Sequence, residues 1–400
     1  MKPAFAADRF ALGEGEYNWA LRNNLRVDRT AAQLYEDAWS RVERRRTALV
    51  DAARALAAER RWTLPEDAGE AVRLVLDRLA ARDRAAADEV LGWYRDAVLR
   101  LVEFGERAGL FDVPAGYPLE VAAATLPQGD SNSARYVPAA PLSAADVGRL
   151  LVPRAAYEVD GERRRHPGEV MADAAREVFP GRDWYFKVLR AGDRVSPVRW
   201  LMPGAVDDSS SMWAHEMAVG GWGLYAAALV AEPAGAASGG VYSPEELLFH
   251  LREELLRDVA AYVDVGLHTG RLAYDEAVTL VSGAHDFLPG SCGDPEVAKD
   301  EVKQASCAHA DRIVYRTSTS PTRAVAARLG QEQIVARRES AAARSPAAFS
   351  LEAFHRALIG QGTVPVGYYR DYGFQVPDPE ARNPNQIPNQ IPNPESQRRE

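Results

Sequence analysis

The sequence predicts a mostly α protein with little sheet. Long segments repeat apolar side chains every three or four residues, which is the spacing of one helix face. Residue types that cap helices stand where several of these segments begin. Proline, glycine, serine and asparagine gather in a few connecting stretches. These three patterns favour helices packed against helices.

The N-terminal part contains three strong helical patterns. Residues 30–60 carry apolar side chains at helical spacing with charges between them, and Thr30 is a good N-cap. Residues 65–82 open with proline and acidic residues, which suit a first helical turn. A third pattern fills residues 84–108 and ends at Gly109.

The centre and C-terminal part continue this pattern after an irregular crossing. Residues 111–141 are rich in turn-forming residues and predict one or two short strands. Residues 212–231 predict a buried helix whose glycines allow close approach of another helix or a substrate. Further helices are expected at 143–152, 166–178, 243–266 (capped by Ser243 and Glu246), 273–283, 296–309, 321–341 and 350–359.

We divide the chain into four parts. Residues 1–115 are the N-terminal helical part, and 116–165 are an irregular connection. Residues 166–376 form a helical core. The polar, repetitive tail 377–400 cannot bury a core and is expected to be disordered.

Composition excludes some classes of function. The net charge of −9 argues against a general nucleic-acid binder. The chain shows neither a signal-peptide pattern nor an apolar stretch that could span a bilayer. Cys292 and Cys307 form no CxxC motif, and we favour two free thiols in a reducing cytosol over the alternative of a disulfide. We therefore expect a soluble cytoplasmic protein, a monomer or homodimer.

One short segment raises a question of chemistry. In AREVFPGRDWYF, residues 175–186, Arg176 and Arg182 flank a Phe-Pro-Gly turn at a spacing where metal ligands are common. Either the segment is an ordinary turn, or it is a metal site whose ligands have been replaced.

Several segments, in order, resemble the DUF885 group of bacterial proteins, which are related in pattern to gluzincin metallopeptidases. The resemblance covers roughly residues 10–372. It implies a helical body around a deep central cleft, a zinc-peptidase-like scaffold. The matching segments are ALGEGEYNWALR (11–22), LVEFGERAGLFDVP (101–114), GGWGLYAAAL (220–229), RDVAAYVDVGLH (257–268), DRIVYRTSTSPTRAVAARLG (311–330) and FHRALIGQGTVPVGYY (354–369).

The resemblance also implies a metal motif that this chain has altered. The family pattern is His-Glu-x-x-Pro-Gly-His-His with a later glutamate, a natural zinc set with a glutamate as base. In this sequence the two histidines fall on Arg176 and Arg182, and the later glutamate falls on Gly220, whereas Glu177 remains. Arginine stays protonated and offers no lone pair to a metal. We expect no metal and no cofactor at this position.

Other candidate residues follow from the same resemblance. His215 and Glu216 precede Gly220, and Glu216 could reach the same helix face from one turn away. In the helix over 257–268 the family residues Arg257, Asp264 and His268 persist. In the segment 311–330 the candidates are Arg312, Tyr315 and Arg323.

Each candidate has a functional and a structural interpretation. Arg176 and Arg182 either bind an anionic group or form salt bridges with Glu177 and Asp183. Glu177 is either a base or an ion-pair partner. His268 and Asp264 act as an acid and its orienting group, or they tie a helix end. His215 and Glu216 are a catalytic pair, or they line the site or support it.

We therefore expect a metal-independent enzyme that acts on a small polar or anionic molecule in an arginine-lined cleft. The catalytic candidates are Glu177, His268, Asp264, Glu216 and His215. The substrate-binding candidates are Arg176, Arg182, Arg257, Arg312, Tyr315 and Arg323. Two alternatives stay open: a non-catalytic protein that binds a small molecule, and a metallohydrolase with relocated ligands.

Overall fold

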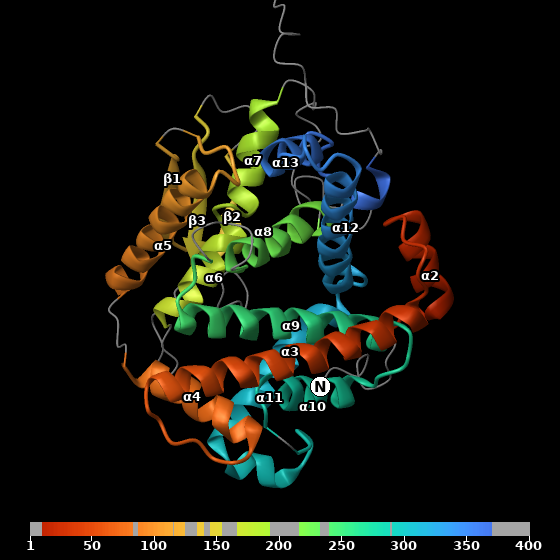
Figure 1. The fold of residues 1–400 in the computed structure, drawn as a ribbon. Coiled ribbons are helices and arrows are strands. Elements are labelled where there is room, and N and C mark those ends of the chain that lie inside the picture. Colours follow the sequence, from red (N-terminus) through yellow and green to blue (C-terminus); the bar gives the residue numbers. More distant parts are fainter. Residues whose placement is uncertain are drawn as a thin grey trace, which may run out of the picture.

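The computed structural model describes residues 10–82, 87–114, 116–124, 134–139, 145–153, 166–192, 216–232, 240–288 and 290–369. The described part is mostly helical, as predicted (Figure 1). In chain order the elements are α2 (Glu14–Asn23), α3 (Ala31–Glu59), α4 (Ala68–Arg82), α5 (Ala87–Ala108), β1 (Leu119–Ala123), β2 (Arg135–Val137), β3 (Gly148–Val152), α6 (Pro167–Glu177), α7 (Arg182–Ala191), the π-helical turn η4 (Glu216–Gly220), α8 (Gly221–Ala231), α9 (Pro244–His268), α10 (Tyr274–His285), η5 (Pro295–Lys299), α11 (Glu301–Ser318), α12 (Arg323–Arg344), α13 (Leu351–Ile359) and η6 (Val366–Tyr368).

Two long helices begin at the capping residues that the sequence marks. The Thr30 side chain accepts a hydrogen bond from the Gln33 backbone N–H, and the Gln33 side chain binds back to the Thr30 N–H. Ser243 and Glu246 make the same reciprocal pair at the start of α9. These capping boxes satisfy N–H groups that a helix end otherwise leaves unpaired.

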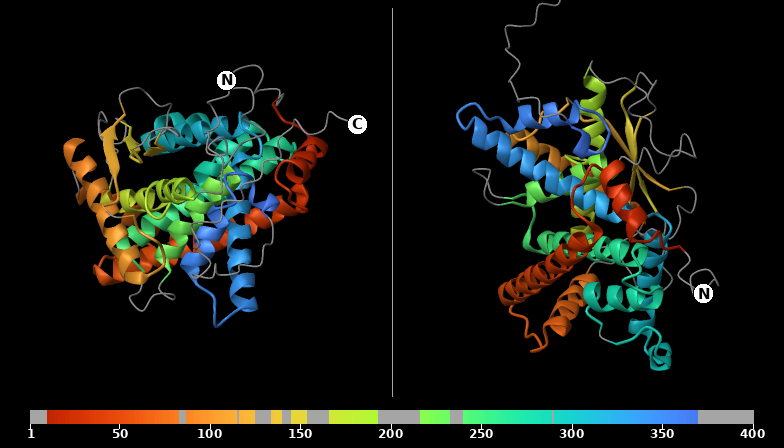
Figure 2. Two further views of the ribbon diagram at one scale, coloured as in Figure 1. Left: turned by 90° about the horizontal axis from the view of Figure 1, so that it is seen from above. Right: turned by 90° about the vertical axis from the view of Figure 1, so that its right-hand side faces the viewer.

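The helices form two tiers, each with its own apolar core. In the lower tier of Figure 1, α3, α4, α10 and α11 pack with α9 around residues such as Leu49, Val75 and Val259. In the upper tier, α5 to α8, α12 and α13 pack with the sheet around Trp184 and Trp222. Figure 2 shows the same division from the side. Helix α9 lies between the tiers and contacts α3, α6, α10, α11 and α12.

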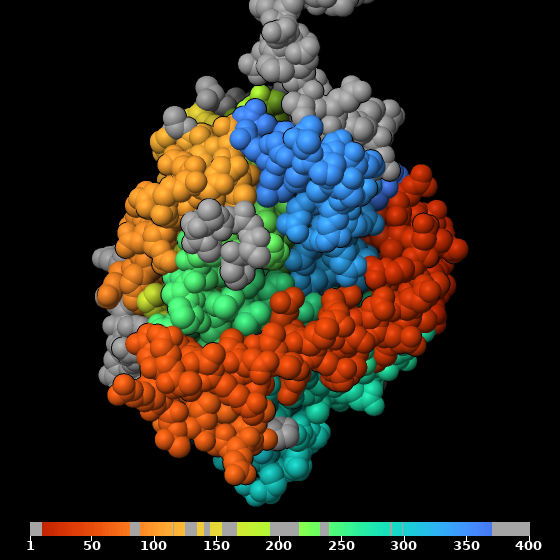
Figure 3. All heavy atoms as spheres, in the orientation of Figure 1, coloured from red at the N-terminus to blue at the C-terminus, as the bar shows by residue number. Residues whose placement is uncertain are grey.

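Helix α3 covers much of one face of the molecule. In the space-filling view it forms a continuous band with α2 across the lower half, next to the exposed part of α9 (Figure 3). Its apolar stripe, which includes Leu34, Val42 and Leu49, is fully buried. Helix α3 is thus held by packing against α9, and α2 and α4 pack against α3.

The prediction of a helix over 143–152 is wrong. Residues Gly148–Val152 form strand β3, the middle strand of a small sheet in which β1 is parallel and β2 antiparallel to it. Burial alternates through Gly148, Arg149 and Leu150, which is the strand period. A short apolar run does not distinguish strand from helix by pattern alone. A side chain at Gly148 would lie 2.2 Å from Asp183 Oδ1 and 2.6 Å from Tyr136.

The predicted glycine-lined helix is confirmed as a close helix contact. A Cβ on Gly221 would lie 2.7 Å from Gly330 Cα, and one on Gly330 would lie 1.8 Å from the Met217 carbonyl oxygen. Helix α12 therefore packs backbone to backbone against η4 and α8. The segment 212–215 lies outside the described residues.

The expectation of free thiols is also wrong. Cys292 and Cys307 form a disulfide with a Cα–Cα distance of 5.7 Å. The predicted helix over 296–309 begins later, at Glu301, where Asp300 caps it with bonds to Val302 and Lys303. Cys307 lies within α11, and Cys292 lies in the loop that follows α10.

Among the described residues, no helix is long and apolar enough to cross a membrane. The tail 377–400 lies outside the described residues, as does most of the connection 116–165.

Candidate functional site: a buried arginine and carboxylate cluster

The turn between α6 and α7 brings Arg176 and Arg182 to the same place. Helix α6 ends at Glu177, and α7 begins at Arg182 after a turn that contains the cis peptide Phe179–Pro180. Only glycine fits at position 181, because a Cβ there would lie 2.0 Å from the Arg176 carbonyl oxygen. The Trp222 indole N–H donates to the Pro180 carbonyl at 2.8 Å and ties α8 to the turn.

Arg176 is bound by two carboxylates on its own helix. Its guanidinium donates to Glu177 and, at 3.0 Å, to Asp173 Oδ1. The Tyr94 hydroxyl donates to the other Asp173 oxygen at 3.0 Å. The Arg176 side chain is 12% exposed and both carboxylates are more deeply buried.

Arg182 joins Glu177 to the π-helical turn. Its Nη2 donates to Glu216 Oε1 at 2.8 Å, and its Nε lies 3.7 Å from Glu177 Oε1. The second Glu177 oxygen accepts the Tyr136 backbone N–H at 3.3 Å. Glu177 therefore contacts both arginines and the sheet.

The cluster reaches solvent beside α9. Arg257 forms an i,i+4 pair with Glu253 at 3.6 Å, and their side chains are 36% and 34% exposed. Helix α6, which carries Arg176, packs against α9, and the Arg176 guanidinium lowers the pKa of Arg257. We define the arginine cluster as Arg176, Arg182 and Arg257 with Asp173, Glu177, Glu216 and Glu253. With every group ionised, three cations face four anions, a net charge of −1.

The carboxylates hold the two inner arginines charged. Burial lowers the pKa of Arg176, but Glu177 and Asp173 outweigh burial and raise it above its usual value. Burial likewise opposes the charge of Arg182, and Glu216 and Glu177 raise its pKa overall. Buried charges are tolerated when they are paired and hydrogen-bonded, as here.

Glu216 fills the space beside Gly220. A Cβ on Gly220 would lie 2.3 Å from Glu216 Oε1, so the absence of a side chain at 220 makes room for this carboxylate. Gly223 likewise allows Arg176 to approach closely, because a Cβ on Gly223 would lie 3.0 Å from the Arg176 carbonyl oxygen. A carboxylate from one turn earlier thus occupies the position where the family resemblance places a glutamate.

The residues present do not fit a zinc ion at this position. Zinc requires lone pairs from imidazole, thiolate or carboxylate groups. Arg176 and Arg182 supply none, and they already bind the carboxylates of Glu177 and Glu216. His215 lies outside the described residues.

Asp264 binds the N-terminus of α12 and His268 contacts the last turn of α11, so neither joins the cluster. Asp264 accepts hydrogen bonds from the backbone N–H groups of Thr322, Ala324 and Val325, and from the Tyr17 hydroxyl. His268 Nε2 lies 3.1 Å from the Thr317 carbonyl oxygen. Along α9, His268 is roughly 16 Å from Arg257 by the helical rise. These contacts match the structural interpretation of the pair.

Three further candidates lie outside the cluster. Arg312 and Tyr315 are on α11, which belongs to the lower tier, and Tyr315 is 41% exposed. Arg323 is the first residue of α12 and is exposed. Asp183, expected to pair with an arginine, is fully buried 3.4 Å from Lys187.

The sequence interpretation missed several partners of the arginines. Asp173 lies three residues before Arg176 and Glu253 four before Arg257, so helical spacing could have identified both. Tyr94 and Tyr136 come from distant segments and gave no local signal. A second buried ion cluster was also missed, in which Arg328 binds Glu254 at 2.7 Å and Asp258 at 2.8 Å.

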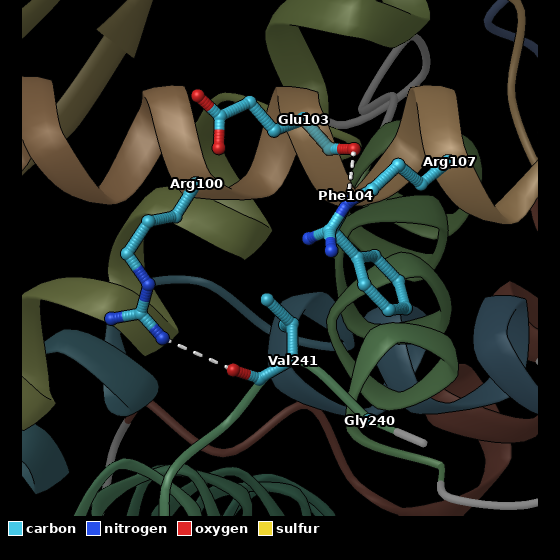
Figure 4. Close-up of a pocket in the computed structure, with 6 residues that line it drawn as sticks. All are labelled: Arg100, Glu103, Phe104, Arg107, Gly240 and Val241. Carbon is cyan, nitrogen blue, oxygen red and sulfur yellow. Dashed lines mark hydrogen bonds between the residues drawn. The ribbon is translucent and has the colours of Figure 1, made fainter. Parts of the chain in front are cut away.

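A small pocket lies apart from the arginine cluster. It has a volume of about 200 Å³ and is lined by Arg100, Glu103, Phe104, Arg107, Gly240 and Val241 (Figure 4). Arg100 binds Glu246 at 2.6 Å and the Val241 carbonyl oxygen at 3.1 Å, and Arg107 Nε binds the Glu103 carbonyl oxygen at 3.2 Å. The arginines of this pocket are therefore engaged within the protein.

The two helical tiers and the small sheet define the chain as a mostly helical protein with a buried polar cluster. The family model "Bacterial protein of unknown function (DUF885)" matches residues 2–371. The chain therefore belongs to the DUF885 family. No curated protein matches the chain.

Two solved structures share the fold. A "putative lipoprotein of unknown function" from Shewanella oneidensis is 19% identical, with a TM-score of 0.66 over 90% of this chain. A "putative lipoprotein" from Colwellia psychrerythraea is 18% identical, with a TM-score of 0.63 over 89% of this chain. The chain spans 59% and 55% of the lengths of these two proteins.

Proposed function

We propose that the protein binds a small polar molecule with an anionic group at the arginine cluster, without a metal at that position. The observation that supports this most is the meeting of Arg176, Glu177, Arg182 and Glu216 in one buried cluster with a solvent-facing edge at Arg257. A ligand carboxylate or phosphate could replace Glu216 or Glu253 as the partner of a guanidinium. Such contacts are bidentate and strong when they are shielded from water.

The charge balance of the cluster restricts the ligand. Because the four carboxylates already offset three guanidiniums, a multiply charged anion gains little from the overall field. A molecule that carries both an anionic group and hydrogen-bond donors would satisfy both kinds of side chain. We therefore favour a small zwitterionic or polar monoanionic ligand.

The contacts of Glu177 favour binding over catalysis. Glu177 contacts two guanidiniums and accepts the Tyr136 backbone N–H, so both of its carboxylate oxygens are engaged within the protein. Asp264 is engaged in capping α12, and His268 contacts the Thr317 carbonyl of α11, so both side chains are used away from the cluster. The second candidate function is the metal-independent enzyme predicted from the sequence. Product formation from the bound ligand would distinguish this enzyme from a protein that only binds the ligand.

Native mass spectrometry of the full chain, purified in the presence of a chelator, tests the proposal. We expect a bound small molecule in the wild type that is lost from Arg182→Gln and kept in Arg344→Gln, an exposed arginine on α12. Denaturation then releases the ligand for identification. A wild type that binds nothing from its native extract or from a panel of amino acids, carboxylates and phosphates would refute the proposal. Equal binding by Arg182→Gln would refute the assigned site.

A further inference from the structure

A second polar cluster lies on the far side of α9 from the arginine cluster. His285, Asp286 and His309 each offer one possible ligand atom, and these three atoms lie within 4.8 Å of one another. His285 Nδ1 lies 2.8 Å from Asp286 Oδ1, and His309 Nδ1 lies 3.7 Å from Asp286 Oδ2. The His285 and Asp286 side chains are 3% and 7% exposed, whereas His309 is 17% exposed and open to solvent.

Rigid elements hold these three side chains. His285 is the last residue of α10, Asp286 caps that helix, and His309 lies within α11. The Cys292–Cys307 disulfide joins the loop after α10 to α11, two residues before His309. The cluster is thus fixed at the junction of two helices by a covalent link that the sequence analysis did not expect.

The Asp286 carboxylate has its own supporting contacts. Ser306 Oγ donates to Asp286 Oδ2 at 2.5 Å, and Ser282 Oγ lies 2.8 Å from Ser306 Oγ. Arg252 Nη2 lies 3.5 Å from Asp286 Oδ1. Outer contacts of this kind orient a ligating carboxylate. The Arg252 guanidinium also repels a cation, so the cluster is expected to bind a metal more weakly than a site without it.

We propose that His285, Asp286 and His309 bind a divalent transition-metal ion of the zinc class. Two imidazole nitrogens and one carboxylate oxygen are a donor set that suits zinc, with a fourth position left for water. The chain contains two cysteines, and both are in the disulfide, so no thiolate competes for the ion. Ligand atoms in a tetrahedral zinc site lie roughly 3.3 Å apart, given zinc–ligand bonds of about 2.0 Å. The three atoms, which lie within 4.8 Å of one another, would move to that spacing when the ion binds.

This site is separate from the arginine cluster. Arg252 and Arg257 are five residues apart on α9 and point about 140° apart around the helix axis. Arg252 faces Asp286, whereas Arg257 faces the arginine cluster. The proposed ion joins α10 to α11 beside the disulfide and takes no part in binding the small molecule.

Cobalt titration of the oxidised, tag-free full chain tests the site. We expect the wild type to bind one Co²⁺ with the intense visible absorption of a tetrahedral site, and Zn²⁺ to displace it. The affinity should fall at least tenfold in His309→Ala. The matched control is Glu301→Gln, which removes an exposed carboxylate from the same helix and should bind as the wild type does.

The change in Tm on addition of Zn²⁺ is a second measurement of metal binding, which applies even if a variant is less stable than the wild type. Zn²⁺ should raise the Tm of the wild type and of Glu301→Gln, and it should leave the Tm of His309→Ala and Asp286→Asn unchanged. A wild type that binds neither Co²⁺ nor Zn²⁺ overturns the proposal. So does a His309→Ala variant that folds and binds the metal with wild-type affinity.

Discussion

At the residue scale, guanidinium groups stand where the DUF885 resemblance places imidazoles. An imidazole offers a lone pair to a cation, whereas a guanidinium offers only donors and a fixed positive charge. Carboxylates surround both guanidiniums: Asp173 and Glu177 bind Arg176, and Glu216 and Glu177 lie against Arg182. The cluster stays buried because its charges are paired.

Removal of one inner arginine should lower the stability of the protein, because it leaves buried carboxylates without their main partner. In Arg176→Met, the buried carboxylates of Asp173 and Glu177 lose their main partner, and we expect a loss of about 3–5 kcal/mol in the free energy of unfolding. Urea unfolding measures it. Arg344→Met, at an exposed position, should stay within about 0.5 kcal/mol of the wild type. An Arg176→Met variant as stable as this control would show that the cluster contributes nothing to the fold.

At the element scale, close helix contacts and buried polar links position the site. Helix α12 meets η4 and α8 at Gly330 and Gly221, which fixes the segment that carries Glu216. Helix α13 is held through His355, which is fully buried. Because the Leu110 carbonyl can only accept, His355 Nδ1 donates to it at 3.1 Å, and Nε2 then accepts the Tyr225 hydroxyl at 2.9 Å.

A pair of glycine variants tests the helix contact. Gly330→Ala would place a Cβ 1.8 Å from the Met217 carbonyl oxygen, and we expect it to lose at least about 2 kcal/mol of stability. Gly92→Ala on α5 meets no atom within 4 Å and should gain about 0.5–1 kcal/mol from helix propensity. Thermal unfolding measures both. Similar Tm values for the two variants would show that the helices do not approach as described.

The stability of the protein should fall in mild acid because of His355. Burial lowers the pKa of His355 to about 3, although its bond to the Leu110 carbonyl opposes this shift. The unfolded chain takes up this proton near pH 6.5 and the folded chain only near pH 3, so the unfolded state binds more protons in between. The free energy of unfolding should therefore decrease as the pH falls from about 6.5 towards 3, by up to about 1.4 kcal/mol per pH unit.

His355→Asn provides the comparison for this pH dependence. The variant lacks the titrating imidazole, and its free energy of unfolding should depend less on pH between 5 and 6.5. Below that range Glu254, whose pKa is about 2 because Arg328 and His250 outweigh its burial, acts in the same direction in both proteins. An unchanged slope in the variant would contradict the assignment to His355.

At the scale of the whole molecule, the sequence predicted the helical class, most helices, the N-cap Thr30 and the cap formed by Ser243 and Glu246, because these depend on local pattern. The prediction failed at residues 143–152, where the structure has a five-residue strand. An apolar run this short is compatible with either a helix or a strand, so its pattern does not distinguish them. The turn that unites Arg176 with Arg182 was visible in the sequence. The tyrosines that bind the cluster's carboxylates come from distant segments: Tyr94 is 79 residues from Asp173, and Tyr136 is 41 residues from Glu177. These contacts follow only from the packing.

The disulfide also belongs to this scale. Cysteine spacing alone does not show whether two thiols meet, and the expected free thiols rested on an expected cytoplasmic location. Location stays a prediction, and a disulfide is more typical of oxidising compartments. The double variant Cys292→Ser/Cys307→Ser should lose about 3 kcal/mol, as expected for opening a loop of this length. Free thiols in denatured, non-reduced wild-type protein would contradict the pairing.

Isothermal titration of the identified ligand, in the presence of a chelator, tests the central claim most directly. We predict that the wild type and Arg344→Gln bind with equal affinity and that Arg182→Gln binds at least tenfold more weakly. Binding that requires added metal, or that is unaffected by Arg182→Gln, would contradict the assignment of a metal-free ligand site to the arginine cluster.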